Sequence, residues 1–250
     1  QGVEGVDYDL VVRPFGVKGI AASLREFTIA ALNQHHGIQA IERFGWERTG
    51  VRDFDGDGVE EEFTIGQMTA IVLFQAALKV PPTSSAIRKH AAGLEIFREV
   101  GCAECHVEKI RLESRVFREP NAFNRPGALN RKVASVVKME LDMGHDEEGW
   151  FLRPFSDIRR HEMCDAEINF LCNEELKQDN VSQSQFLTSR LWNLANSAPY
   201  CHRGDCLSIN QAILAHGGEA HAARQIYLAL PQEKKSKLVE FLMALGTDQQ

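Results

Sequence analysis

Two cysteines and a histidine stand close together in the middle of the chain, at Cys102, Cys105 and His106. They form the motif C-x-x-C-H, in which two thiols lie one turn apart and an imidazole follows directly. Thiols at this spacing reach the two vinyl groups of a haem, and the adjoining histidine then falls beneath the iron as an axial ligand. The motif occurs once, so the sequence predicts one covalently bound haem c.

Two other kinds of site use the same residue types. A thioredoxin-like redox pair would need a strand–helix–strand context around the cysteines, and a zinc site would need a second pair of ligands at matched spacing. Neither context is evident in the sequence. A helix is expected before Gly101 and another at the end of the chain, which is typical of the way cytochrome c surrounds its haem. Haem attachment is therefore the favoured interpretation.

The remaining cysteines form two short-range pairs, Cys164 with Cys172 and Cys201 with Cys206. Surplus cysteines in close pairs are typical of disulfides in an oxidising compartment, although spacing does not fix their connectivity. Buried free thiols and a metal site are the alternatives. Together with a covalent haem, the pairs predict a periplasmic or extracellular protein whose signal peptide has been removed.

The second axial position of the iron is open to several residues. A haem with one histidine needs either another protein ligand, for electron transfer, or a free position, for chemistry. The pair His35-His36 could serve a haem on a partner, but a pair of surface histidines is the simpler interpretation. The candidates are the five methionines together with His35, His36, His90, His145, His161, His202, His216 and His221.

An acidic segment beginning at Asp53 is a second candidate site. Its spacing matches the start of a calcium loop, with acidic residues at positions 1, 3 and 5, glycine at 6 and a backbone carbonyl at 7. Position 12 is Thr64 where a bidentate glutamate belongs, so this is not a complete EF-hand. A solvated acidic turn would use the same residues for its backbone shape. The predicted ligands are Asp53, Asp55, Asp57, Val59 and, for the missing carboxylate, Glu61 or Glu62.

Composition limits the class of protein. The 250 residues include 44% hydrophobic and 25% charged residues, which predicts a globular chain with a true core. The formal net charge of −7 leaves no basic excess for nucleic acid, so no such partner is expected. No run of about 18 apolar residues occurs, so no membrane span is expected.

The elements that must position these residues are expected to be mainly α-helical, with long loops and little strand. Ser23 begins one helix with a capping box, Ser84 or Ser85 and Ser208 cap two others, and Pro231 precedes the last. The expected helices cover residues 23–32, 66–78, 84–100, 132–143, 208–215 and 231–245. A short strand is expected over Leu10–Val12 and a loop over 45–59.

The motif Ala198-Pro-Tyr-Cys-His202-Arg-Gly, followed by a helix that ends in His216-Gly-Gly, resembles the C-terminal half of bacterial di-haem cytochrome c peroxidases. More specifically, the chain resembles the di-haem c-type oxidoreductases, a peroxidase-like and thiol-oxidoreductase-like family related to rubber oxygenases. The resemblance spans most of residues 8–245. The stretches that carry it are Asp53–Phe63, Gly101–His106, Pro154–Met163, Leu191–Tyr200 and Ala212–Ala220.

The resemblance implies a set of haem contacts. His216 stands where those peroxidases place the methionine that ligates their C-terminal haem, which implies a bis-histidine, low-spin and low-potential iron. His161 and His202 are the alternative ligands, and are otherwise expected beside the haem as hydrogen-bonding residues. Arg160, with Arg159, is expected to pair with haem propionates.

The chain departs from that family in lacking a second C-x-x-C-H motif and the domain that would hold it. Residues 1–83 are therefore expected to be an N-terminal remnant of the inter-domain part, and 84–250 a cytochrome c-like domain with one haem. The expected function is the electron-transfer half of a peroxidase-like oxidoreductase, whose catalytic haem lies on another segment or chain. A mono-haem electron carrier or haem-stacking wire is the alternative, and a haem sensor ranks last. Either main reading implies a redox partner or second haem-bearing chain, within an oligomer or complex.

Overall fold

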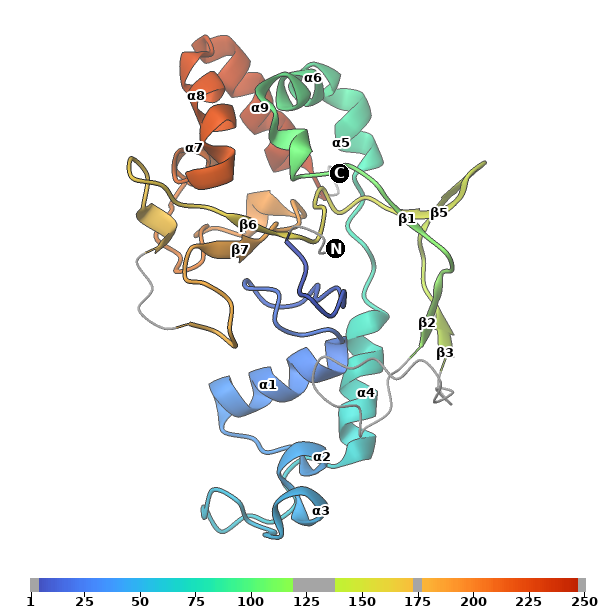
Figure 1. Cartoon of the computed structure of the whole chain (residues 1–250). Helices are drawn as coiled ribbons and strands as arrows, with labels where there is room; N and C mark the ends of the chain where they lie inside the picture. Colours follow the sequence, from blue (N-terminus) through green and yellow to red (C-terminus); the bar gives the residue numbers. More distant parts are fainter. Residues whose placement is uncertain (1–4, 119–137, 173–176, 247–250) are drawn as a thin grey trace.

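The structure, a computed structural model, describes residues 5–118, 138–172 and 177–246, and helices predominate among them (Figure 1). The helices are α1 (Leu24–His36), α2 (Ile41–Phe44), α3 (Trp46–Thr49), α4 (Ile65–Ala76), α5 (Ser84–Lys89), α6 (Ala91–Val100), α7 (Ile209–Leu214), α8 (His221–Ala229) and α9 (Gln232–Ala244). The strands are β1 (Ile110–Leu112), β2 (Val116–Arg118), β3 (Lys138–Glu140), β4 (Gly144–Asp146), β5 (Gly149–Leu152), β6 (Arg160–Glu162) and β7 (Gln185–Leu187). The expected predominance of helix is confirmed, but strand is more frequent than expected.

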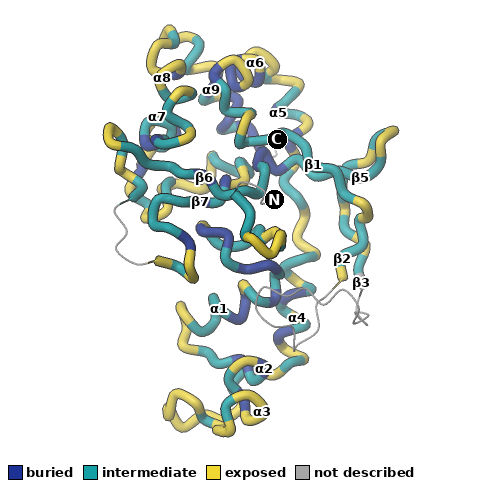
Figure 2. Tube along the Cα trace, in the orientation of Figure 1, coloured by how far each residue is buried: buried dark blue, intermediate teal, exposed yellow. Residues whose placement is uncertain are grey.

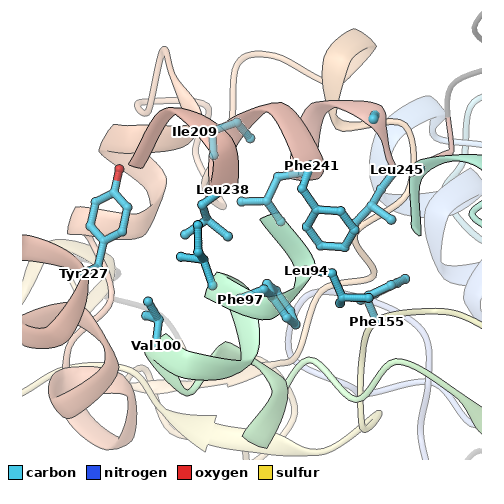
Figure 3. Close-up of a cluster of buried hydrophobic side chains, with 13 residues drawn as sticks. Leu94, Phe97, Val100, Phe155, Ile209, Tyr227, Leu238, Phe241 and Leu245 are labelled. Carbon is cyan, nitrogen blue, oxygen red and sulfur yellow. The ribbon is translucent and has the colours of Figure 1, made fainter. Parts of the chain in front are cut away.

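The larger apolar core lies where α6 packs against α9 (Figure 3). Apolar residues recur along both helices at helical spacing, so each helix turns one apolar stripe towards the other. Gly93 lets the two backbones approach closely, because a Cβ at this position would lie 2.5 Å from the carbonyl oxygen of Lys237. The buried side chains of this core include Leu94, Phe97, Val100, Phe155, Leu238, Phe241 and Leu245.

A second, smaller core joins α1 and α4 at the opposite end of the molecule (Figures 1 and 2). Ser23 caps α1 by accepting a hydrogen bond from the backbone N–H of Glu26, as expected. Arg25 of α1 forms a buried ion pair with Glu42 of α2, with 2.9 Å between the guanidinium and the carboxylate. The buried apolar members of this core are Ile29, Ala40, Met68 and Val72.

The strands form three small antiparallel sheets in the described part of the chain. In the first, β5 lies between β1 and β4, and in the second β2 pairs with β3. The third pairs β6 with β7 and places His161 opposite Phe186. The N-terminal segment lies along this third sheet, because the backbone N–H of Leu187 donates to the carbonyl of Val17 at 2.9 Å. Segments far apart in the sequence therefore meet at β6 and β7.

Three expectations about local structure are wrong. The strand expected over Leu10–Val12 does not form, because Leu10 has a positive φ of 58° and its N–H closes a turn onto the carbonyl of Asp7. The helix expected over 132–143 is contradicted at Lys138–Glu140, which is β3, while residues 132–137 lie outside the described residues. The loop expected over 45–59 contains the short helix α3.

Two further differences concern helices between residues 84 and 229. The helix expected over 84–100 is divided into α5 and α6 at His90, whose backbone (φ −118°, ψ 40°) is not helical. The helix α8 was not expected.

No helix among the residues that the structure describes has the length and apolar character needed to cross a bilayer.

Candidate haem site

All six cysteines lie in described parts of the chain, and they divide into two chemical groups. Cys164 bonds to Cys172 and Cys201 bonds to Cys206, with Cα–Cα distances of 6.1 and 5.5 Å. This confirms the disulfide prediction and its pairing by proximity. The free cysteines are those of the C-x-x-C-H motif, Cys102 and Cys105.

The free cysteines lie on a tight turn at the end of α6. Gly101 ends the helix in the left-handed region (φ 94°), and a 3₁₀ turn follows over Cys102–Glu104. The backbone N–H of His106 donates to the carbonyl of Cys102 at 2.9 Å, which closes the turn around the motif. Burial raises the pKa of the Cys102 thiol to about 12. A redox-active pair requires a lowered thiol pKa, so this environment disfavours the thioredoxin-like alternative.

His106 follows this turn and is partly buried, and a hydrogen bond to a backbone carbonyl fixes its tautomer. Its Nδ1 is 2.9 Å from the carbonyl oxygen of Phe155, and a carbonyl can only accept, so Nδ1 carries the proton. Burial lowers the pKa of His106 to about 4, which keeps the imidazole neutral. Nε2 therefore retains its lone pair. A neutral imidazole held through Nδ1 by a backbone carbonyl is the usual arrangement of a metal-binding histidine.

His216 shares these features and follows the end of α7. Its Nδ1 is 2.7 Å from the carbonyl oxygen of Ala212, and burial lowers its pKa. The two histidines are close enough that His216 contributes to the lowered pKa of His106, after the larger effect of burial. The fold thus brings together two neutral imidazoles from segments that lie far apart in the sequence. The donor set of two thiols and two neutral imidazoles fits a haem c.

His161 is also near the motif, but its ring nitrogens are both engaged. Nε2 lies 2.8 Å from Asp157 and Nδ1 lies 2.7 Å from Glu219. Hydrogen bonds with Asp157, with the Cys105 side chain and with Glu219 raise the pKa of His161 to about 11. An imidazolium has no lone pair for iron, so this arrangement disfavours His161 as the second ligand. The positions of Asp157 and Glu219 in the sequence form no pattern that predicts their contacts with His161.

His202 and Arg160 occupy other environments. His202 is exposed, lies within the Cys201–Cys206 loop and packs edge-on against Phe186, with 5.9 Å between ring centroids. Arg160 pairs with Asp7 of the N-terminal segment. Arg13 pairs with the same carboxylate, and the pairing of Arg160 with a haem propionate remains a prediction.

The acidic loop brings three of its predicted ligands together. Carboxylate oxygens of Asp53, Asp55 and Asp57 lie within 4.8 Å of one another. The Asp53 carboxylate accepts hydrogen bonds from the N–H groups of Gly56 and Gly58, at 2.8 and 3.0 Å. These bonds shape the turn without an ion.

The remaining predicted members of the loop are used differently, and Glu61 lies 3.5 Å from the guanidinium of Arg52. Glu62 accepts a hydrogen bond from the N–H of Gln39 at 2.7 Å, so its carboxylate stabilises a neighbouring segment. The N–H of Val59 donates to Asp57 at 2.8 Å. The three aspartates thus converge, whereas Glu62 does not join their group.

Residues 142–245 match a family profile described as "Di-haem oxidoreductase, putative peroxidase". This part of the chain is di-haem oxidoreductase-like. The match confirms the resemblance stated from the sequence and covers His161, His202 and His216, while the C-x-x-C-H motif precedes the matched region.

Among solved structures, the chain is similar to a chain of the hydrazine synthase of Kuenenia stuttgartiensis, determined under 20 bar of xenon. The identity is 17% and the TM-score 0.41, and the similarity covers 78% of this chain and 60% of that chain. This similarity is too low to indicate a function. A search of the curated proteins found no match.

Proposed function

We propose that this protein is the electron-transfer half of a di-haem, peroxidase-like oxidoreductase. The family match supports a haem redox role at the coarser level. The observation that carries the finer proposal is the pair of partly buried, neutral histidines, His106 and His216, each with Nδ1 bonded to a backbone carbonyl.

The residues that would hold the haem are Cys102 and Cys105, through thioether bonds to its vinyl groups, and His106 and His216, as ligands of its iron. Haem c supplies a one-electron Fe(III)/Fe(II) couple when bound. Two imidazole ligands stabilise Fe(III) more than one imidazole and one thioether do, so the proposed site has a low potential. The carbonyls of Phe155 and Ala212 fix the orientation of both rings.

Partner and place in the cell follow from the same proposal. With one haem motif in the chain, catalysis would occur at a second haem on another segment or chain, within a complex. Two disulfides support a periplasmic or extracellular location. The division into residues 1–83 and 84–250, with a cytochrome c-like second part, remains a prediction, as does calcium at the acidic loop.

The test combines haem quantification with substitution of His216. In the native assembly, pyridine-haemochrome analysis should give one haem c for each copy of this chain. Low-temperature EPR should show that this haem is low-spin. His216→Met should raise the reduction potential and keep the iron low-spin, whereas His216→Gly should give a high-spin or water-bound haem. His145→Gly is the matched control, because His145 is exposed and packs on Trp150, with 4.5 Å between centroids.

The same spectra separate the two candidate roles. An additional high-spin haem that reacts with peroxide supports the oxidoreductase, with the catalytic haem on a partner. A single low-spin species in the assembly supports the alternative, a mono-haem carrier or wire. If both His216 variants keep the wild-type spectrum, His216 is not a ligand and the proposal fails.

A further inference from the structure

The ring of His161 connects two carboxylates that belong to different parts of the haem site. Asp157 lies four residues before His161 on the same segment, and Glu219 lies 58 residues further along the chain. The His161 and Asp157 side chains are each 9% exposed, so the hydrogen bond between them forms in a largely water-excluded setting, whereas the Glu219 side chain is 38% exposed. We call Asp157, His161 and Glu219 the carboxylate–histidine bridge.

The Asp157 end of this bridge is fixed to the C-x-x-C-H motif. The backbone N–H of Asp157 donates to the carbonyl of Cys105 at 2.9 Å, and that of Ser156 donates to Val107 at 3.0 Å. The preceding residue, Phe155, supplies the carbonyl that binds Nδ1 of His106. Residues 155–157 therefore move with His106.

The Glu219 end is fixed to the segment that carries His216. Glu219 follows His216 by three residues, and its second carboxylate oxygen accepts from the N–H of Glu162 at 2.8 Å. The N–H of Gly217 donates to the carbonyl of Met163 at 3.2 Å. His161 thus lies on a segment that is bonded to both ligand-bearing parts of the chain.

We infer that His161 is a positioning residue: through Asp157 and Glu219 it fixes the relative placement of His106 and His216 and so holds both rings in position for the iron. The inference deepens the proposed function and rests on its assignment of those two ligands. Both carboxylates accept hydrogen bonds, so the ring must donate from both of its nitrogens. A planar ring that donates at opposite edges spans the two acceptors, whereas a glutamine amide at this position can reach only one of them.

The test is His161→Gln, with His145→Gln as the matched control on the exposed side chain. Both variants are made in the full chain with its haem. The first readout is the low-spin EPR signal of the oxidised protein at neutral pH. The second is the rate at which carbon monoxide binds the reduced haem, which is limited by departure of an axial histidine in a bis-histidine site.

Loss of a charge-assisted hydrogen bond from the bridge should speed the departure of His216 by roughly tenfold or more. His161→Gln should therefore bind carbon monoxide at least that much faster and acquire a high-spin component, while His145→Gln keeps wild-type behaviour. A merely structural role would lower the thermal midpoint without changing the spectrum or the carbon monoxide rate of the folded protein. That result would overturn the inference.

A second variant keeps the inference testable if His161→Gln fails to fold. Glu219→Gln leaves an oxygen that accepts from His161 but removes the charge, so a smaller acceleration in the same direction is expected. A carbon monoxide rate for Glu219→Gln equal to that of wild type would also overturn the inference. The proposed function fails separately, and visibly, if the wild-type haem is not a bis-histidine species.

Discussion

The crossing of α6 and α9 yields a prediction whose size follows from the structure. Gly93→Ala adds a methyl group that would lie 2.5 Å from both the carbonyl oxygen of Lys237 and the Cβ of Phe241. Neither neighbour is a flexible side-chain end, so the two helices must separate by about 1 Å to restore ordinary contact. Phe241 packs edge-on against Phe155, with 5.9 Å between centroids, and Phe155 supplies the carbonyl that binds His106. The strain therefore reaches the haem site.

Two opposing contributions set the change in the free energy of unfolding that Gly93→Ala causes. Overpacking a tight core contact costs about 1–3 kcal/mol. Replacing glycine by alanine inside a helix recovers about 1 kcal/mol of helix propensity. Gly66→Ala is the matched control, because Gly66 lies in α4 and a Cβ there would meet no atom within 4 Å. Since propensity is common to both variants, Gly93→Ala should be less stable than Gly66→Ala by about 1–3 kcal/mol.

The assay is urea unfolding of both variants and of wild type at 25 °C, followed by circular dichroism and by the haem absorption. Equal slopes in urea would show that the midpoints report stability alone. The expected difference corresponds to thermal midpoints that are lower by about 2–4 °C per kcal/mol for a chain of this size. If Gly93→Ala is as stable as Gly66→Ala, the close approach of α6 and α9 is not real and the reasoning fails.

Two more predictions follow from side chains outside the crossing. The N–H groups of Ile168 and Gly218, and to a smaller extent His221, hold the pKa of Asp165 below its usual range. This carboxylate should stabilise the fold above the unfolded-state pKa of about 3.9, and the effect should disappear as the pH falls towards the folded-state value. The thermal midpoint of wild type, measured by calorimetry, should thus exceed that of Asp165→Asn between pH 5 and 7. The gap should begin to narrow near pH 4 and shrink further as the pH falls towards the folded-state pKa. A gap independent of pH would contradict this. At the acidic loop, calorimetric titration of the wild-type protein with calcium should give one site that is lost in Asp55→Asn, and absence of heat in the wild type would assign the loop to a solvated turn.

Sequence reasoning succeeded where the information is local. Ser208 caps α7 by accepting from the N–H of Gln211, and the cysteine pairs are separated by only 8 and 5 residues. The C-x-x-C-H motif is equally local, and the haem that it would bind remains a prediction. Such features depend on side chains within one or two turns, which a single sequence displays completely.

Tertiary contacts decided the features that sequence reasoning missed. The strands are three or four residues long, which is too short for an alternating pattern to be recognised. Except for the local hairpin of β4 and β5, they pair with segments distant in the sequence. The break at His90 is marked by neither glycine nor proline. The environment of His161 depends on Glu219, a partner 58 residues away, so its charge state could not be read from the segment that carries it.

The N-terminal segment imposes an order on folding. Lys18 is fully buried, with Nζ 2.7 Å from the carbonyl of Gln183, and Arg190 donates to the carbonyl of Pro14 across 176 residues. Closing a loop of about this length costs roughly 4–5 kcal/mol of chain entropy before its contacts form. During synthesis residues 14–18 emerge well before their partners, which lie 165 and 176 residues further along the chain. This segment should therefore fold late, and the high contact order should make it the slow step in reaching the native state.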